Sequence, residues 1–248
     1  MIKENLSKLY EALPEGVKLV AVSKFHPVER LMEAYDAGQR IFGENRPQEL
    51  AAKVPQMPSD VQWHYIGHLQ TNKLKMVLPY VSLVQSVDSV HLYQAIRKWA
   101  ESNGRVINVL LELHLGAEET KHGLTEEEIW TLLAVEGVGA ENSATLGLEG
   151  GAQPPAGRGR EATYSAPIPS AAPSVRIVGL MGMATNTDDM SVVEKDFERI
   201  EKLFRKLQES YPQLTELSIG MSGDWPLAVK HSATMVRIGT DIFGPREY

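Results

Sequence analysis

The chain contains no cysteine among its 248 residues. This absence excludes disulfide bonds, thiolate nucleophiles and zinc sites built from thiolates, and it fits a reducing compartment. A basic excess is also missing, since 25 Lys and Arg stand against 32 Asp and Glu, for a net charge of −7. We therefore expect neither nucleic acid nor an anionic membrane surface as a partner.

Long apolar runs are lacking as well. No stretch approaches the length that spans a bilayer. Residues 1–5 carry mixed charge without the apolar core of a secretory signal. These features predict a soluble, cytoplasmic protein.

Short apolar, β-prone segments alternate with amphipathic ones along the chain. Alternation of this kind predicts a parallel sheet, and we therefore expect an α/β fold. We expect a single domain over residues 1–248 that begins with a helix at 2–13. Eight strands in about 250 residues favour a closed (β/α)8 TIM barrel, with a doubly wound open sheet as the alternative. The expected strands are 19–24, 40–43, 62–66, 82–86, 106–113, 175–181, 216–219 and 235–238.

Several helix starts are marked by capping residues. Thr125 with Glu128, and Ser191 with Glu194, have the spacing of capping boxes. The second box would open a long amphipathic helix. Asn45 precedes a proline-started helix and is expected to cap it. A shorter helix is expected at about 72–78.

One segment does not follow the alternation. Between residues 137 and 174, 24 of 38 residues are Gly, Ala, Pro or Ser. Such a composition buries too little apolar surface to offset its chain entropy. We expect a flexible insert without a catalytic role.

Lys24 is the first candidate site residue. Only Ser23 separates it from the four apolar residues of the first strand (19–22), at the point where that strand emerges from the core. In a barrel this end of the strand faces the functional side. Lysine suits Schiff-base chemistry because its pKa shifts readily on partial desolvation. The alternative is a strand-end lysine that extends into solvent.

Two glycine-rich loops favour an anion. Ser222 lies between glycines after the seventh strand, and Gly239 and Thr240 end the eighth. The loops after these two strands frequently bind phosphate in TIM barrels. Each loop alone could be a turn or a strand end, but together with Lys24 they predict a phosphorylated ligand held as a Schiff base.

A series of motifs stands in order along the chain. The motifs are VSK (22–24), FGEN (42–45), HYIGHLQTNK (64–73), GLM (179–181), SIGMSGD (218–224), VRIGT (236–240) and IFG (242–244). With these motifs the chain resembles the pyridoxal phosphate homeostasis proteins (YggS/PROSC type), whose fold resembles the barrel domain of alanine racemase. The resemblance covers nearly the whole chain apart from 137–174, where the family has a short link.

The resemblance implies that pyridoxal 5'-phosphate (PLP) is bound through Lys24. It further implies that Ser222, Gly239 and Thr240 hold the phosphate and that Asn45 lines the pocket. Arg237 would lie near the cofactor, at its phosphate or at its pyridine nitrogen.

The same resemblance implies a role in the control of PLP supply, with little catalysis. The chain would be a monomer that passes PLP to apo-enzymes. A PLP racemase needs a second proton-transfer group opposite the lysine, and only residues 241–248 follow the last strand, so the extra domain that supplies this group in alanine racemase is not expected. Tyr65 or His68 could substitute.

Two alternatives stay open, a compact PLP enzyme such as an amino-acid racemase and a barrel that binds another phosphorylated metabolite. The sequence predicts no metal site. His64 and His68 are four residues apart, but they fall on a strand and a turn without an evident acidic third ligand.

Overall fold

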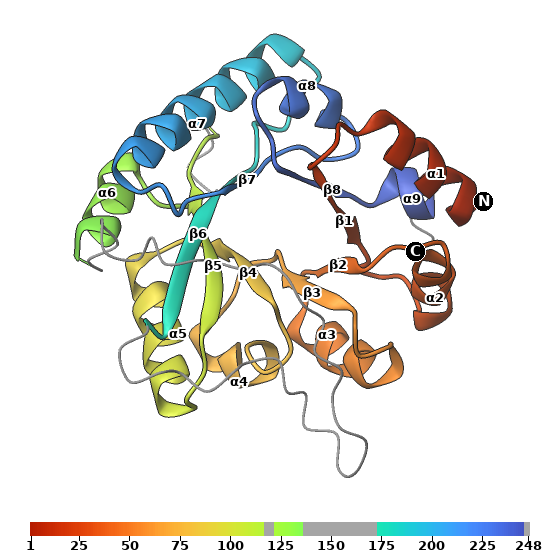
Figure 1. Ribbon diagram of the computed structural model, residues 1–248, viewed down its shortest axis with the longest axis horizontal. Helices are drawn as coiled ribbons and strands as arrows, with labels where there is room; N and C mark the ends of the chain where they lie inside the picture. The colour runs from red at the N-terminus through yellow and green to blue at the C-terminus, as the bar shows by residue number, and fades with distance from the viewer. Residues whose placement is uncertain (117–121, 136–172, 246–248) are drawn as a thin grey trace.

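A computed structural model describes residues 1–116, 122–135 and 173–245. Eight parallel strands bond in chain order and close into a barrel through pairing of the first with the last (Figure 1). This confirms the TIM barrel and rules out the open sheet. The strands are β1 (Lys18–Val22), β2 (Ile41–Glu44), β3 (Gln62–Tyr65), β4 (Leu83–Val87), β5 (Ile107–Leu113), β6 (Val175–Gly182), β7 (Glu216–Ser218) and β8 (Met235–Ile238).

Helices surround the barrel and cover its outer face (Figure 1). Each strand is followed by a helix, and one further helix, α1, precedes the barrel as expected. The helices are α1 (Ile2–Ala12), α2 (Val28–Asp36), α3 (Pro47–Lys53), α4 (Leu74–Val77), α5 (Val90–Ser102), α6 (Glu126–Val135), α7 (Met190–Ser210), α8 (Trp225–Lys230) and α9 (Thr240–Phe243), with 3₁₀ turns at Val54–Gln56 and Thr71–Lys73.

The first and last helices lie side by side (Figure 1). Asn5 of α1 donates a hydrogen bond of 3.1 Å to the carbonyl of Ile242 in α9. The apolar face of α1, which includes Ile2, Leu6 and Leu9, is buried. This contact fastens the start of the chain to the end of the barrel.

The barrel interior changes from apolar to polar along the strands. Leu83, Leu110 and Met235 belong to a buried apolar cluster inside the barrel. Side chains two residues apart on a strand share one face. The next inward positions of β4, β5 and β8 are therefore polar, and they are Gln85, Glu112 and Arg237, all buried. The polar layer lies toward the carboxyl ends of the strands, where TIM barrels carry their sites.

The capping predictions had mixed outcomes. Thr125 and Glu128 form the expected box, with reciprocal hydrogen bonds of 2.8 and 3.2 Å. The Ser191 box is wrong, because the helix start lies two residues earlier: α7 begins at Met190, and Asp189 is its N-cap, accepting a 2.9 Å bond from the Ser191 amide. An aspartate in the cap position satisfies a free amide as well as serine does.

Asn45 is not a cap either. Arg46 precedes α3 in extended conformation, without a side-chain capping bond. The helix expected at 72–78 is also shorter, a 3₁₀ turn followed by the single-turn α4.

The predicted insert at 137–174 falls almost entirely outside the described residues. Ser174 is an exception; it is buried, and its carbonyl accepts a 2.9 Å bond from Ile107 at the start of β5. In the described ranges no helix combines the length and apolar character needed to cross a membrane.

Candidate functional site at the barrel mouth

The candidate site lies at the carboxyl ends of the strands. We call the residues that follow the strands there the mouth. They are 23–26, 45–46, 66–70, 88–89, 114–116, 183–184, 219–224 and 239–240. Every sequence-predicted site residue belongs to the mouth except Arg237, which lies two residues before Gly239, on β8.

A tight turn fixes the backbone around Lys24. Ser23 is buried, and its amide continues the sheet by bonding to the carbonyl of Gly43 at 3.0 Å. Lys24 follows and is half-buried. Phe25 then adopts a φ of +68°, a left-handed conformation uncommon for a bulky residue, and its amide donates to Glu49 at 2.8 Å. The strained turn therefore presents Lys24 at one defined place of the mouth.

A buried ionic network holds the backbone of this turn in place. The Lys53 ammonium donates to the Ser23 carbonyl at 2.9 Å and to Glu44 and Glu49 at 2.7 and 3.1 Å. Ser23 also donates its hydroxyl to Glu44 at 2.7 Å. Burial raises the pKa of Glu44, and the Lys53 charge opposes this rise. The network joins the ends of β1 and β2 to α3.

Sequence reasoning missed this network. Glu49 and Lys53 do have the four-residue spacing of a helical ion pair. That spacing usually marks an exposed helix face, whereas the Lys53 side chain is only 8% exposed. The burial arises because α3 packs over the ends of two strands.

Asn45 lines the mouth beside the third strand. Tyr65 donates its hydroxyl to the Asn45 carbonyl at 2.9 Å. A Cβ on Gly67 would lie only 2.4 Å from that carbonyl oxygen, so the two loops touch backbone to backbone. The side-chain oxygen Oδ1 of Asn45 is buried and has no hydrogen-bond partner within the described part of the chain. A buried acceptor of this kind suits a polar ligand group.

Arg237 is buried beneath the mouth. Its guanidinium donates to the Ser218 hydroxyl and carbonyl at 2.7 and 2.8 Å and to the Gly182 carbonyl at 2.9 Å. Burial lowers the pKa of Arg237 to about 10, while the nearby carboxylates of Glu112 and Asp224 oppose this shift. The cation is therefore held rigidly between β6 and β7.

Further polar side chains fill the same layer. Ser218 donates its hydroxyl to Gln85 at 2.7 Å, and Gln85 lies 2.8 Å from Nδ1 of His64. Burial, aided by the charge of Lys18, lowers the pKa of His64 to about 3, so His64 is a neutral interior group. Burial and the Asp88 charge raise the pKa of Glu112 to about 7.

The two predicted phosphate loops meet at the mouth. Ser222 lies close to Asp241, which follows Thr240 in α9, and opposes the rise that burial causes in the pKa of Asp241. Gly239 packs on the first strand, since a Cβ there would lie 3.3 Å from both Cβ and O of Val22. Val22 stands two residues before Lys24. The structure therefore brings Lys24, Ser222, Gly239 and Thr240 to one side of the mouth.

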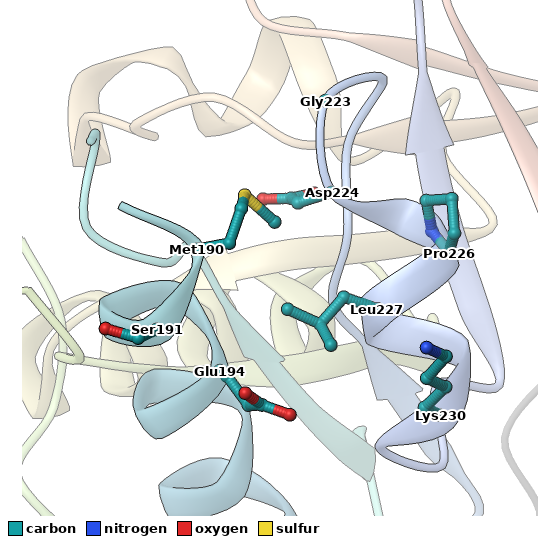
Figure 2. Close-up of a pocket in the computed structure, with 8 residues that line it drawn as sticks. All are labelled: Met190, Ser191, Glu194, Gly223, Asp224, Pro226, Leu227 and Lys230. Carbon is teal, nitrogen blue, oxygen red and sulfur yellow. The ribbon is translucent and has the colours of Figure 1, made fainter. Parts of the chain in front are cut away.

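A separate cleft of about 360 Å³ opens between α7 and α8. In Figure 2, Met190 of α7 extends toward Asp224, and Leu227 of α8 extends toward α7. Gly223 and Asp224, which line this cleft, directly follow Ser222 in the loop after β7. The cleft lies outside the barrel and contains none of the predicted site residues.

His64 and His68 point to different places. His64 is in the interior, whereas His68 lies in the mouth with its ring 2.6 Å from Asp88. The Tyr65 hydroxyl is held by backbone carbonyls, and burial raises its pKa to about 12. Tyr65 is thus a poor acceptor of protons near neutral pH.

Comparison with known proteins places this chain in a family. The family model "Alanine racemase, N-terminal domain" matches residues 1–147 and 160–247. Among curated relatives, a pyridoxal phosphate homeostasis protein of Aquifex aeolicus is 34% identical over 252 residues, covering 100% of this chain and 96% of the relative. The mouse protein of the same name is 35% identical, covering 93% and 77%. The chain belongs to the pyridoxal phosphate homeostasis protein family.

Solved structures agree with this membership. The structure of the family member PipY from Synechococcus elongatus, described as having PLP bound, is 33% identical with a TM-score of 0.77 and covers 98% of this chain and all of that one. Alanine racemase from Corynebacterium glutamicum is 17% identical with a TM-score of 0.65, and this chain covers 60% of it. The second likeness concerns the fold alone.

The family model also shortens the stretch over which this chain differs from the family. The only internal residues it leaves unmatched are 148–159, a shorter stretch than the 137–174 of the sequence analysis.

Proposed function

We propose that this chain binds PLP covalently through Lys24 and takes part in intracellular PLP homeostasis by storing the cofactor, delivering it and limiting free aldehyde. The names of its relatives and the PLP-bound PipY structure support this proposal. One observation carries it: Gly239 packs on Val22, so the lysine after β1 and the anion-suited loops after β7 and β8 share one side of the mouth.

The residues present fit a phosphorylated pyridine aldehyde. When bound, PLP supplies an aldehyde carbon that condenses with the Lys24 amine as a Schiff base. Ser222 and Thr240 offer hydroxyl donors, and the first amides of α9 lack intrahelical partners. Gly239 lets the loop after β8 pack closely on Val22, beside the strand end that carries Lys24.

Arg237 and Asn45 would contact the ring of the cofactor. Arg237 lies two residues before Gly239 and deeper in the barrel, between Ser218 and Gly182, and this depth favours the pyridine nitrogen over the phosphate. A guanidinium has only donors, so it would keep that nitrogen unprotonated. The unpartnered Oδ1 of Asn45 would accept a hydrogen bond from a polar group of the ring.

The absorption spectrum of the purified protein with added PLP tests the proposal. We expect a long-wavelength Schiff-base band in the wild type, lost in Lys24→Ala and retained in Lys75→Ala, a control at an exposed lysine of α4. Borohydride should fix the adduct on Lys24. A wild type without the band would overturn the proposal and favour the binding of another phosphorylated metabolite.

A compact PLP enzyme is the second candidate function. The His68–Asp88 pair at the mouth favours it, since a histidine oriented by a carboxylate is a suitable proton acceptor. Incubation with PLP and small amino acids in deuterium oxide distinguishes the two. Exchange of the α-proton at catalytic turnover would indicate an enzyme, whereas release of PLP to amines or apo-enzymes without exchange would indicate a carrier.

The proposal also covers the compartment, the oligomeric state and the partners of the protein. We expect a cytoplasmic, single-domain monomer whose recipients are PLP-dependent apo-enzymes. Light scattering during size exclusion should give a mass near the 27.5 kDa of one chain.

A further inference from the structure

Three potential metal ligands converge on the mouth beside the proposed PLP pocket. They are His68, Asp88 and His122, and one ligand atom of each lies within 4.8 Å of the others. The three residues come from different loops, after β3, β4 and β5. No two of them are closer than 20 positions in the sequence, so only the closure of the barrel brings them together.

Their geometry is already close to that of a metal centre. Nδ1 of His68 lies 2.6 Å from Oδ2 of Asp88. The rings of His68 and His122 stack with centroids 4.3 Å apart and planes 20° from parallel. Ligand atoms of a tetrahedral zinc site lie roughly 3.3 Å apart, given zinc–ligand distances of about 2 Å. Small side-chain rotations of the two exposed histidines would bring the three atoms to this spacing.

The surrounding structure holds the ligands in place. The backbone of His68 is fixed on both sides, since Ser86 donates to the Gly67 carbonyl at 2.5 Å and Tyr65 lies 3.3 Å from the His68 carbonyl. Leu124, two residues after His122, bonds to the Glu112 carbonyl at 2.7 Å and so anchors that segment on β5. Such outer contacts are what orient the ligands in metal sites.

Charge also favours a cation here. The Asp88 side chain is only 6% exposed, yet it carries a carboxylate. The carboxyl group of Glu112 lies near enough to interact with it electrostatically. In this partly desolvated place the Asp88 carboxylate attracts a divalent cation more strongly than an exposed carboxylate would.

We propose that His68, Asp88 and His122 bind a divalent transition-metal ion, with zinc as the best match. Two imidazoles and one carboxylate are ligands that zinc accepts. Three protein ligands leave a fourth position open to water or to a ligand in the mouth. The simpler alternative is a histidine–aspartate pair with a stacked second histidine and no metal affinity.

Zinc binding by the purified protein tests this inference. The protein is stripped with a chelator, incubated with Zn²⁺ without added PLP and dialysed, and bound metal is counted by mass spectrometry. We expect about one zinc per chain. His68→Ala, Asp88→Asn and His122→Ala should each weaken binding at least tenfold, whereas His91→Ala, at an exposed histidine of α5, should bind as the wild type does.

Cobalt gives an independent readout of geometry. Co²⁺ in the site should show the intense visible absorption of a low-coordinate ion in the wild type, and this absorption should be lost in His122→Ala. Wild-type protein that retains no zinc, or ligand variants that bind as well as His91→Ala, would overturn the proposal. Because the Lys24 band is measured separately, either proposal can fail without the other.

Discussion

At the scale of single residues, the barrel interior changes from apolar to polar over two positions of a strand. Leu110 is followed on the inward face by Glu112, and Met235 by Arg237. The same spacing places these polar side chains between the apolar floor of the barrel and the mouth. Polar groups in such a layer interact more strongly than they would in water, which suits them to fixing the orientation of a charged cofactor.

The phosphate loops give the first prediction at this scale. Ser222→Ala and Thr240→Val should each weaken PLP binding about tenfold or more, since a hydrogen bond to a charged group contributes roughly 1.5–3 kcal/mol. Both variants should still form the Schiff-base band at high PLP, because Lys24 is intact. Titration of the band with PLP measures the effect. Thr215→Val, at the opposite end of β7, should titrate as the wild type does; equal affinities in all variants would contradict the assignment.

His64 gives a pH-dependent prediction. Its pKa is lowered to about 3 in the folded chain from an ordinary value of 6.5, so the unfolded chain binds the proton first as the pH falls. The neutral ring thus favours folding above pH 6.5, and this contribution is lost progressively below it. Between pH 7 and 5 the loss amounts to about 2 kcal/mol.

Denaturant unfolding at several pH values measures this loss. His64→Gln should show a flatter decline of the unfolding free energy between pH 7 and 5 than the wild type. His91→Gln, which changes an exposed histidine, should keep the wild-type slope. Parallel declines in all three proteins would show that His64 is not the group responsible.

At the scale of elements, the start of α7 provides a direct test. Asp189, not Ser191, caps this 21-residue helix. We expect Asp189→Ala to lower the melting temperature by about 2–4 °C, the usual effect of losing a cap in a protein of this size. Ser191→Ala should change it little. A larger effect of Ser191→Ala in thermal scans would restore the capping box predicted from the sequence.

At the scale of the whole molecule, barrel closure couples the two ends of the chain. Lys18 pairs in register with Met235, and α1 bonds to α9. We therefore expect one cooperative unfolding transition in urea, because no part of the closed barrel keeps its core when another part opens. The four tryptophans lie on β3, α5, α6 and α8.

Tryptophan fluorescence and far-ultraviolet circular dichroism should therefore give the same midpoint. Added PLP should raise that midpoint in the wild type but not in Lys24→Ala, because a ligand that binds only the folded state stabilises it. Two separated transitions would contradict the single-domain interpretation.

The sequence by itself determined the number and order of the strands and the residues at the strand ends, and it favoured a closed barrel over an open sheet. These features follow from local patterns, since apolar runs of fixed period and glycine-bracketed turns act over a few residues. The positions of Lys24, Ser222, Gly239 and Thr240 could therefore be predicted before their contacts were known.

Only the tertiary structure decided which distant side chains meet. The burial of Lys53 against Glu44, the interior place of His64 and the convergence of His68 with Asp88 and His122 depend on the closure of the barrel. Sequence spacing set His64 and His68 four residues apart without an acidic third ligand, whereas adjacent loops of a barrel bring together residues that are far apart in the chain. Asp189 rather than Ser191 caps α7 because of where this helix begins. Sequence patterns locate a helix start only to within a few residues.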